Sequence, residues 1–236
     1  MPILTEAQIK QGYFHRIGGF PALSYRTEDN PNYARELQDY KGQERLCICC
    51  TQLDNYGYSD REKKRVLAEW LDFLRNNTKT FKGLHFNSRV PQSLFDAACC
   101  QEDLEELRFK WGAYSDLSAL ENLRQLKFLY IGSGASVQDI TILGKLNTLI
   151  VLYVENFKRI EDYSVLTSLE HLEQLIISGP ILGTTKIMDL EFLRQMPNLL
   201  SFWRPNAATR RKYSQEELIS LREALPNLTY IYESNS

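Results

Sequence analysis

Two stretches of the sequence decide the fold: residues 126–134, LKFLYIGSG, and residues 149–157, LIVLYVENF. Each places a tyrosine among apolar residues, and Tyr130 and Tyr153 stand 23 positions apart. Both stretches have apolar residues at their first, fourth and sixth positions, and the fourth and sixth alternate with the tyrosine as in a β-strand. Neighbouring side chains of a strand point to opposite faces, so we expect the tyrosines to point away from the flanking apolar residues.

The same six-residue opening recurs from Phe81 to the C-terminus. The openings are FKGLHF at residue 81, LEELRF at 104, LKFLYI at 126, LIVLYV at 149, LEQLII at 172, LLSFWR at 199 and LTYIYE at 228. They begin 23, 22, 23, 23, 27 and 29 residues apart. A period of this length indicates one small structural unit repeated along the chain, in which each unit buries its apolar side against its neighbours.

The second half of the repeat also follows a rule. Four aspartates are each followed by an apolar residue and then by apolar residues at every third position: Asp116, Asp139, Asp162 and Asp189. Apolar residues three apart predict a short 3₁₀ or α turn with one buried stripe. An aspartate before that stripe suits the N-cap position, where its carboxylate accepts hydrogen bonds from the first backbone N–H groups.

These residues resemble the leucine-rich repeat (LRR) superfamily over residues 81–236, specifically the short-repeat class with an Asp-apolar turn on the convex side. The resemblance implies an α/β fold: a right-handed solenoid with a parallel concave sheet of about seven strands and short 3₁₀ or α turns on the convex side. The sequence departs from the pattern in two ways. The asparagine common near the ninth position is absent, and Arg204 and Glu233 replace the apolar sixth residue of the last two units. We therefore expect a looser C-terminal capping unit, with a helix that starts at a Ser214–Glu217 capping box.

Residues 1–80 lack the repeat and are predicted to form an N-terminal extension and a strand–helix cap. Residues 45–53, RLCICCTQL, have the apolar character of a strand. Residues 58–77 predict an amphipathic helix that begins at Ser59 or Asp60. A strand and a helix placed before the first repeat would cover the open apolar end of the array.

The first part of this region is rich in turn-forming residues. Residues 32–42 predict a short helix that ends at Gly42. For residues 1–44 we prefer an irregular extension packed on the cap over the alternative of an arm that contacts a partner.

Composition places the chain among ordinary globular proteins, with a net charge of −2, 25% charged residues and 43% hydrophobic residues. There is no basic excess to indicate nucleic acid as the default partner. The N-terminus lacks a signal-peptide pattern, and no run approaches the roughly 20 apolar residues of a membrane helix. We expect a cytoplasmic protein without a membrane partner.

The sequence carries no catalytic signature. It lacks the motifs of nucleophile elbows, phosphate-binding loops, dinucleotide-binding turns and zinc proteases, so we predict no catalytic residues, no cofactor and no metal site. The five cysteines are an odd number and are predicted to be reduced and mostly buried. His15, His85 and His171 are predicted to be surface or packing residues. The basic run at residues 210–212 predicts a solvated loop.

The predicted concave face carries the third, fifth and seventh residues of each opening. The fifth-position row consists of His85, Arg108, Tyr130, Tyr153, Ile176, Trp203 and Tyr232. Adjacent strands lie about 4.8 Å apart, so these side chains should form one continuous, aromatic-rich row. Together with neighbouring positions, the predicted protein-binding residues are His85, Glu106, Arg108, Lys110, Phe128, Tyr130, Val151, Tyr153, Glu155, Ile176, Trp203, Tyr230 and Tyr232.

The sequence therefore predicts a non-enzymatic protein–protein interaction module that binds a partner through its concave face, as an inhibitor, an immunity protein or an adaptor. Aromatic residues and arginine often dominate interface energies. The row has two alternative roles: it is covered by the N-terminal segment, or its aromatic residues stabilise cross-strand pairs. The alternative function is an enzyme or a nucleic-acid-binding protein that uses Cys47, Cys49, Cys50 and the Arg210–Lys212 run.

Overall fold

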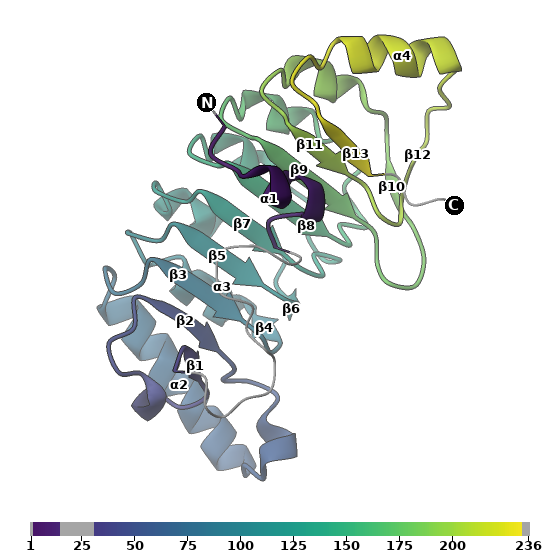
Figure 1. Ribbon diagram of the computed structural model, residues 1–236. Coiled ribbons are helices and arrows are strands. Elements are labelled where there is room, and N and C mark those ends of the chain that lie inside the picture. Colours follow the sequence, from purple (N-terminus) through teal and green to yellow (C-terminus); the bar gives the residue numbers. More distant parts are fainter. Residues whose placement is uncertain (1, 15–30, 233–236) are drawn as a thin grey trace.

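A nine-stranded parallel sheet forms one side of the repeat array in the computed structural model, which describes residues 2–14 and 31–232 (Figure 1). Its strands, in spatial order, are β1 (Tyr33–Ala34), β2 (Arg45–Ile48), β3 (Gly83–Phe86), β5 (Glu106–Phe109), β7 (Phe128–Ile131), β8 (Val151–Glu155), β9 (Gln174–Ser178), β11 (Ser201–Trp203) and β13 (Tyr230–Tyr232). Every strand of this sheet from β3 onward begins at the third position of a predicted opening. The predicted parallel sheet is confirmed, and β1 and β2 extend it at the N-terminal end.

The strands are aligned without a shift from one repeat to the next. Tyr130 pairs with Arg108 on one side and with Tyr153 on the other, and Tyr153 pairs with Ile176. The same register continues to His85, Trp203 and Tyr232, so the whole fifth-position row crosses the sheet as predicted. A constant register keeps the row on one face of the sheet because side chains alternate with a period of two.

The main core lies on the other side of the sheet. The fourth residues of the first six openings stack in register and are at most 2% exposed: Leu84, Leu107, Leu129, Leu152, Leu175 and Phe202. Buried leucines of the convex turns pack in the same core: Leu120, Leu143, Leu166 and Leu193. Burial of one such side chain stabilises the fold by about 1.5–3 kcal/mol, so the regular apolar spacing is what holds successive repeats together.

Short 3₁₀ turns cover the convex side of the described repeats: η3 (Ser118–Asn122), η4 (Thr141–Lys145), η5 (Ser164–Ser168) and η6 (Glu191–Gln195). Each predicted aspartate accepts a hydrogen bond of 2.8–2.9 Å from the backbone N–H two residues later. The N-cap itself is the apolar residue between them, so the predicted N-cap assignment is wrong by one position. The aspartate still satisfies the first free N–H, but it does so through an Asx turn.

The N-terminal cap consists of β2 and α2 (Asp60–Asn76), as predicted, with Ser59 at the start of the helix. Trp70 and Leu74 of α2 are fully buried against the core. In the first repeat a helix, α3 (Gln92–Ala98), takes the place of a 3₁₀ turn and contacts α2.

The predicted helix over residues 32–42 is wrong. Tyr33 and Ala34 form β1, which pairs in parallel with β2, and only η1 (Leu37–Asp39) is helical. The edge of β2 would otherwise expose unpaired backbone groups, and pairing with β1 satisfies them. A second 3₁₀ turn, η2 (Leu53–Tyr56), links β2 to α2.

The strands of the C-terminal unit are shorter than those of the central repeats. Strands β11 and β13 have three residues each, whereas β8 and β9 have five. Arg204 follows the end of β11, and its guanidinium donates a hydrogen bond to the carbonyl of Ala207 at 3.2 Å. The predicted helix is present as α4 (Gln215–Glu223), with the Ser214–Glu217 capping box. Glu233 lies outside the described residues.

Two small sheets join neighbouring loops beside the main sheet. They pair β4 (Val90–Pro91) with β6 (Gly112–Ala113), and β10 (Thr185–Ile187) with β12 (Ala207–Thr209). Across residues 2–14 and 31–232, no helix has the length and apolar content needed to span a bilayer.

Candidate functional site

The concave face, which is the side of the sheet opposite the 3₁₀ turns, carries the fifth-position row. A distant part of the chain lies across it: residues 2–14, called the N-terminal segment below, whose helix α1 (Glu6–Gln11) runs in front of β8 and β9 (Figure 1). Thr5 and Gln8 form a capping box at the start of α1. Gly12 ends the helix with a φ of 78°, a backbone conformation that favours glycine.

Apolar side chains of this segment bury the centre of the row. The cluster consists of Leu4, Ile9, Tyr13 and Phe14 from the segment and of Tyr130, Ile150, Val151, Tyr153, Ile176, Leu200 and Trp203 from the sheet. Tyr130, Tyr153 and Trp203 are only 7%, 6% and 9% exposed. Residues 2–14 therefore pack on the concave face, and the expected packing on the end cap is wrong for them. Of the two alternative roles of the row, cover by the N-terminal segment is present in the structure.

The rings of the segment continue an aromatic stack of the sheet. Tyr13 stacks on Phe128 with ring centroids 4.1 Å apart and planes 2° from parallel. Phe14 lies 5.7 Å from Tyr130, which in turn stacks on Tyr153 at 4.3 Å. Aromatic pairs of this kind contribute about 0.5–1.5 kcal/mol beyond their burial. Tyr130 thus forms both a cross-strand contact and a contact with the segment.

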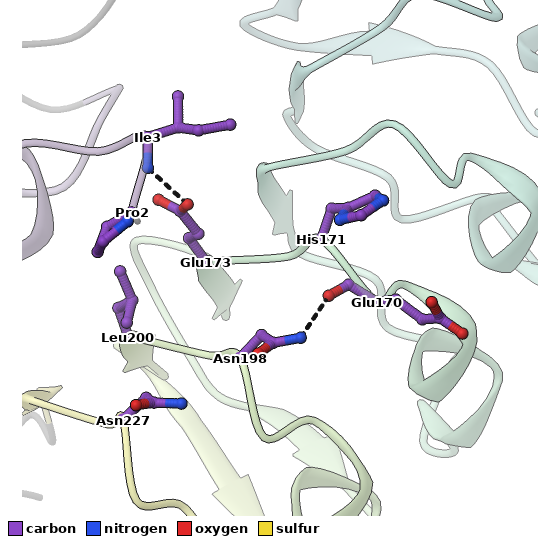
Figure 2. Close-up of a pocket in the computed structure, with 8 residues that line it drawn as sticks. All are labelled: Pro2, Ile3, Glu170, His171, Glu173, Asn198, Leu200 and Asn227. Atoms are coloured by element: carbon purple, nitrogen blue, oxygen red, sulfur yellow. Dashed lines mark hydrogen bonds between the residues drawn. The ribbon is translucent and has the colours of Figure 1, made fainter.

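Two consecutive side chains, Glu173 just before β9 and Gln174 at its first position, bind the backbone of the segment. The carboxylate of Glu173 accepts hydrogen bonds from the N–H groups of Ile3 at 2.6 Å and Leu4 at 2.8 Å; Figure 2 shows the first of these. Gln174 is fully buried, and its Oε1 accepts from the N–H of Tyr13 at 2.8 Å. Its Nε2 donates to the hydroxyl of Ser201 at 2.7 Å. The segment is therefore held at both ends of α1.

A buried carboxylate lies beyond the ring of Tyr13. Glu106 is 0% exposed, accepts a hydrogen bond from Nε2 of His85 at 2.7 Å and pairs with the guanidinium of Arg45 at 3.1 Å. The hydroxyl of Tyr13 lies 3.4 Å from the same carboxylate. Burial lowers the pKa of His85, so a neutral imidazole donates to Glu106 at neutral pH. His85 is thus a buried side chain of the outward row, and its assignment to the protein-binding residues stays a prediction.

The remaining predicted residues surround this centre. Glu155 accepts a hydrogen bond from the hydroxyl of Tyr130, and burial together with Tyr153 and Glu155 raises the pKa of Tyr130. The guanidinium of Arg108 lies 5.1 Å from the centre of the Tyr130 ring, a cation–π distance.

Three predicted residues lie at the margins of the face. Lys110 is exposed and directly follows β5. The backbones of Tyr230 and Tyr232 are in register with Ser201 and Trp203. His15 lies outside the described residues.

Solved structures of other proteins have the same architecture. An internalin (InlF) from Listeria monocytogenes is similar with a TM-score of 0.55 and 22% identity over 69% of this chain and 44% of its own. The fold is that of a leucine-rich repeat protein. The sequence matches no protein-family model and no curated protein.

Two further solved structures are similar at lower scores. Internalin C2 from L. monocytogenes has a TM-score of 0.47 and 22% identity over 68% of this chain and 62% of its own. An LRR protein from Leptospira interrogans has a TM-score of 0.37 and 15% identity over 84% of this chain and 54% of its own. The chain spans about half the length of these three proteins.

A cavity of about 410 Å³ adjoins the start of the N-terminal segment (Figure 2). Its lining consists of Pro2, Ile3, Glu170, His171, Glu173, Asn198, Leu200 and Asn227. The side chain of Asn198 donates to the carbonyl of Glu170, and that of Asn227 donates to the carbonyl of Pro197, both at 2.8 Å. These asparagines therefore link successive LRR units, and Glu173 binds the segment.

Several residues that favoured an enzyme or a nucleic-acid-binding protein are buried or ion-paired. Cys47 is fully buried, and burial raises its pKa to about 12, which disfavours the reactive thiolate. Arg210 is ion-paired with Glu161, and Arg211 with Glu191 at 3.1 Å and Glu217 at 2.6 Å. No group of three or more histidine, cysteine, aspartate or glutamate residues within the described ranges could hold a metal ion.

The sequence reasoning missed the residues that cover the face. Tyr13, Phe14 and Glu173 were not predicted, and Gln174 was placed on the face without a role. The sequence TEAQI at residues 5–9 contains a Thr-x-x-Gln capping box followed by an apolar residue, which could have predicted α1. No sequence signal specifies that this helix docks on strands more than a hundred residues later.

Proposed function

We propose that the chain is a non-enzymatic protein-interaction module that binds a protein partner through its concave face, as an inhibitor, an immunity protein or an adaptor. The observation that carries this proposal is that the face already holds a peptide. Its aromatic and aliphatic residues bury four apolar side chains of the N-terminal segment. At the same time, Glu173 and Gln174 bind the backbone of that segment. A surface that combines side-chain pockets with backbone acceptors has the chemistry of a peptide-binding site.

The dimensions of the face also suit a protein partner. The predicted outward positions number three on each of seven strands, and a standard interface uses roughly 20–30 residues and about 800 Å² on each side. Arg108 and Glu155 are half-buried beside the covered centre, and Lys110 is exposed. Charged residues at the margin of an aromatic centre provide selectivity and speed the encounter with a complementary partner.

In a Tyr13→Ala/Phe14→Ala chain, whose N-terminal segment competes less for the face, replacement of Tyr153 and Trp203 together by alanine is expected to weaken partner binding by about 2–4 kcal/mol, which is roughly a 30- to 800-fold rise in Kd. The reason is that both side chains belong to the aromatic centre and not to the leucine core. The partner is first captured from the native lysate and identified, and its Kd is then measured for each variant by titration calorimetry.

The matched control replaces Leu218 and Ile219 by alanine. These two residues are exposed apolar residues of α4, a helix that lies at the C-terminal end of the array, away from α1 (Figure 1). The control should bind as the wild type does. An unchanged Kd for the Tyr153/Trp203 double variant, with circular dichroism showing an intact fold, would remove the concave face from the interface.

A further inference from the structure

We infer that the N-terminal segment is a tethered ligand of the concave site, and that a partner segment of the same chemistry displaces it. That chemistry is a short amphipathic helix followed by two consecutive aromatic residues, the first of which carries a hydroxyl group. The inference rests on the proposed function of the face, and it names both the partner class and the element that a partner must compete with.

The segment contacts the sheet as a bound peptide does. Leu4, Ile9, Tyr13 and Phe14 are at most 9% exposed, and all four contribute to the same apolar cluster. The other side of α1 is polar and faces solvent: Glu6, Lys10 and Gln11 are exposed. The four apolar residues of the segment, which are Leu4, Ile9, Tyr13 and Phe14, therefore pack on one surface of the sheet. None of them belongs to the leucine core.

The contacts separate into general and selective ones. The hydrogen bonds to Glu173 and Gln174 come from backbone N–H groups, which nearly every peptide can supply. The selective contacts come from side chains at the end of the segment. The ring of Tyr13 stacks on Phe128, its hydroxyl points to Glu106, and the ring of Phe14 packs on Tyr130. A competing segment is therefore recognised by its aromatic pair.

Docking of the segment is reversible on physical grounds. Helix α1 has six residues, and a helix of that length does not form on its own in water. Its order depends on contact with the face, and such locally stabilised elements open without unfolding the rest of the protein. Covalent attachment nevertheless gives the segment a high effective concentration at the site. A free peptide should therefore bind well only after the tethered copy has been weakened.

The test uses the full chain and a labelled synthetic peptide of residues 2–14, PILTEAQIKQGYF. We expect the peptide to bind a Tyr13→Ala/Phe14→Ala chain with a Kd at least tenfold below that for the wild-type chain, measured by fluorescence anisotropy. A peptide that carries the same two substitutions should bind neither chain. A Lys10→Ala/Gln11→Ala chain alters only the solvent side of α1 and should behave as the wild type does.

Two safeguards keep the test decisive. Circular dichroism reports whether the double variant retains the repeat fold, and Ile9→Ala provides a milder variant, for which we expect an intermediate Kd. Equal peptide binding by wild-type and variant chains, or no binding by a folded variant, would overturn the inference. Sedimentation that shows a wild-type dimer and a variant monomer would also overturn it, because the occupant would then be the segment of a second copy.

Failure of the tethered-ligand inference can be distinguished from failure of the proposed function. Peptide binding that depends on Tyr13 and Phe14, combined with the absence of any partner that competes with the peptide, would support the tethered site and contradict the proposed function. The converse result is a partner that binds wild-type and Tyr13→Ala/Phe14→Ala chains equally but loses affinity for the Tyr153/Trp203 variant. That result would support the proposed function and contradict the tethered site.

Discussion

Replacement of Leu152 by alanine is expected to lower the free energy of unfolding by about 2–5 kcal/mol. Leu152 is 0% exposed and stands in register between Leu129 and Leu175, so its removal leaves a cavity bordered by two neighbouring repeats. Repeat arrays are stabilised by such interfaces between neighbours, and a defect in the central strand weakens the contacts on both sides. Urea unfolding followed by circular dichroism measures the change.

The control for this prediction is Asn147→Ala. Asn147 is exposed on the turn that leads into β8, so its replacement should change stability by less than about 0.5 kcal/mol. A loss below about 1 kcal/mol for Leu152→Ala would contradict the assignment of the fourth-position ladder to the core.

Replacement of Arg45 by methionine is expected to cost about 2–3 kcal/mol at pH 7, because the fully buried carboxylate of Glu106 loses its ion pair with the guanidinium. His85 still donates a hydrogen bond to that carboxylate, but as a neutral group it adds no opposite charge. The side chain of Arg45 is 39% exposed, which keeps the expected loss below that of a fully buried pair.

A double-mutant cycle tests this role of Arg45. In an Arg45→Met/Glu106→Gln chain the buried charge is gone, so the double variant should be more stable than the sum of the two single losses predicts. Additive losses would mean that Arg45 acts through the packing of its alkyl chain or through Glu105, which it also contacts at 3.2 Å.

The repeat could be predicted from the sequence because each of its signals is local and recurs. Tyr130 and Tyr153 were assigned to the outward face from strand alternation alone, and their pairing in the sheet confirms this register. The convex turns were found in the same way, although the tight 3₁₀ geometry moves each aspartate one residue before the N-cap. Periodicity specifies which residues face the core, because a shift of one residue in the strand would turn every side chain to the opposite face of the sheet.

The cover of the face could not be predicted by the same means. The stacking of Tyr13 on Phe128 joins residues more than a hundred positions apart, and residues 1–44 contain no repeat to set a register. Gln174 illustrates the difficulty: its outward position was correct, but its role depends on the N–H of Tyr13. Strand alternation shows which way the tyrosines point, and the structure shows that another part of the same chain covers them.

Hydrogen exchange of the backbone N–H of Tyr13 tests the central claim most directly, because this group donates to the buried Gln174 only when the N-terminal segment lies on the face. Exchange detected by NMR should show protection of at least tenfold for Tyr13 in the wild-type chain, with Leu4 also protected through Glu173. The backbone N–H at position 13 and that of Leu4 should lose this protection in the Tyr13→Ala/Phe14→Ala chain, while the amides of β8 stay protected. Exchange at the rate of an unstructured peptide in the wild-type chain would contradict a segment that occupies the concave site.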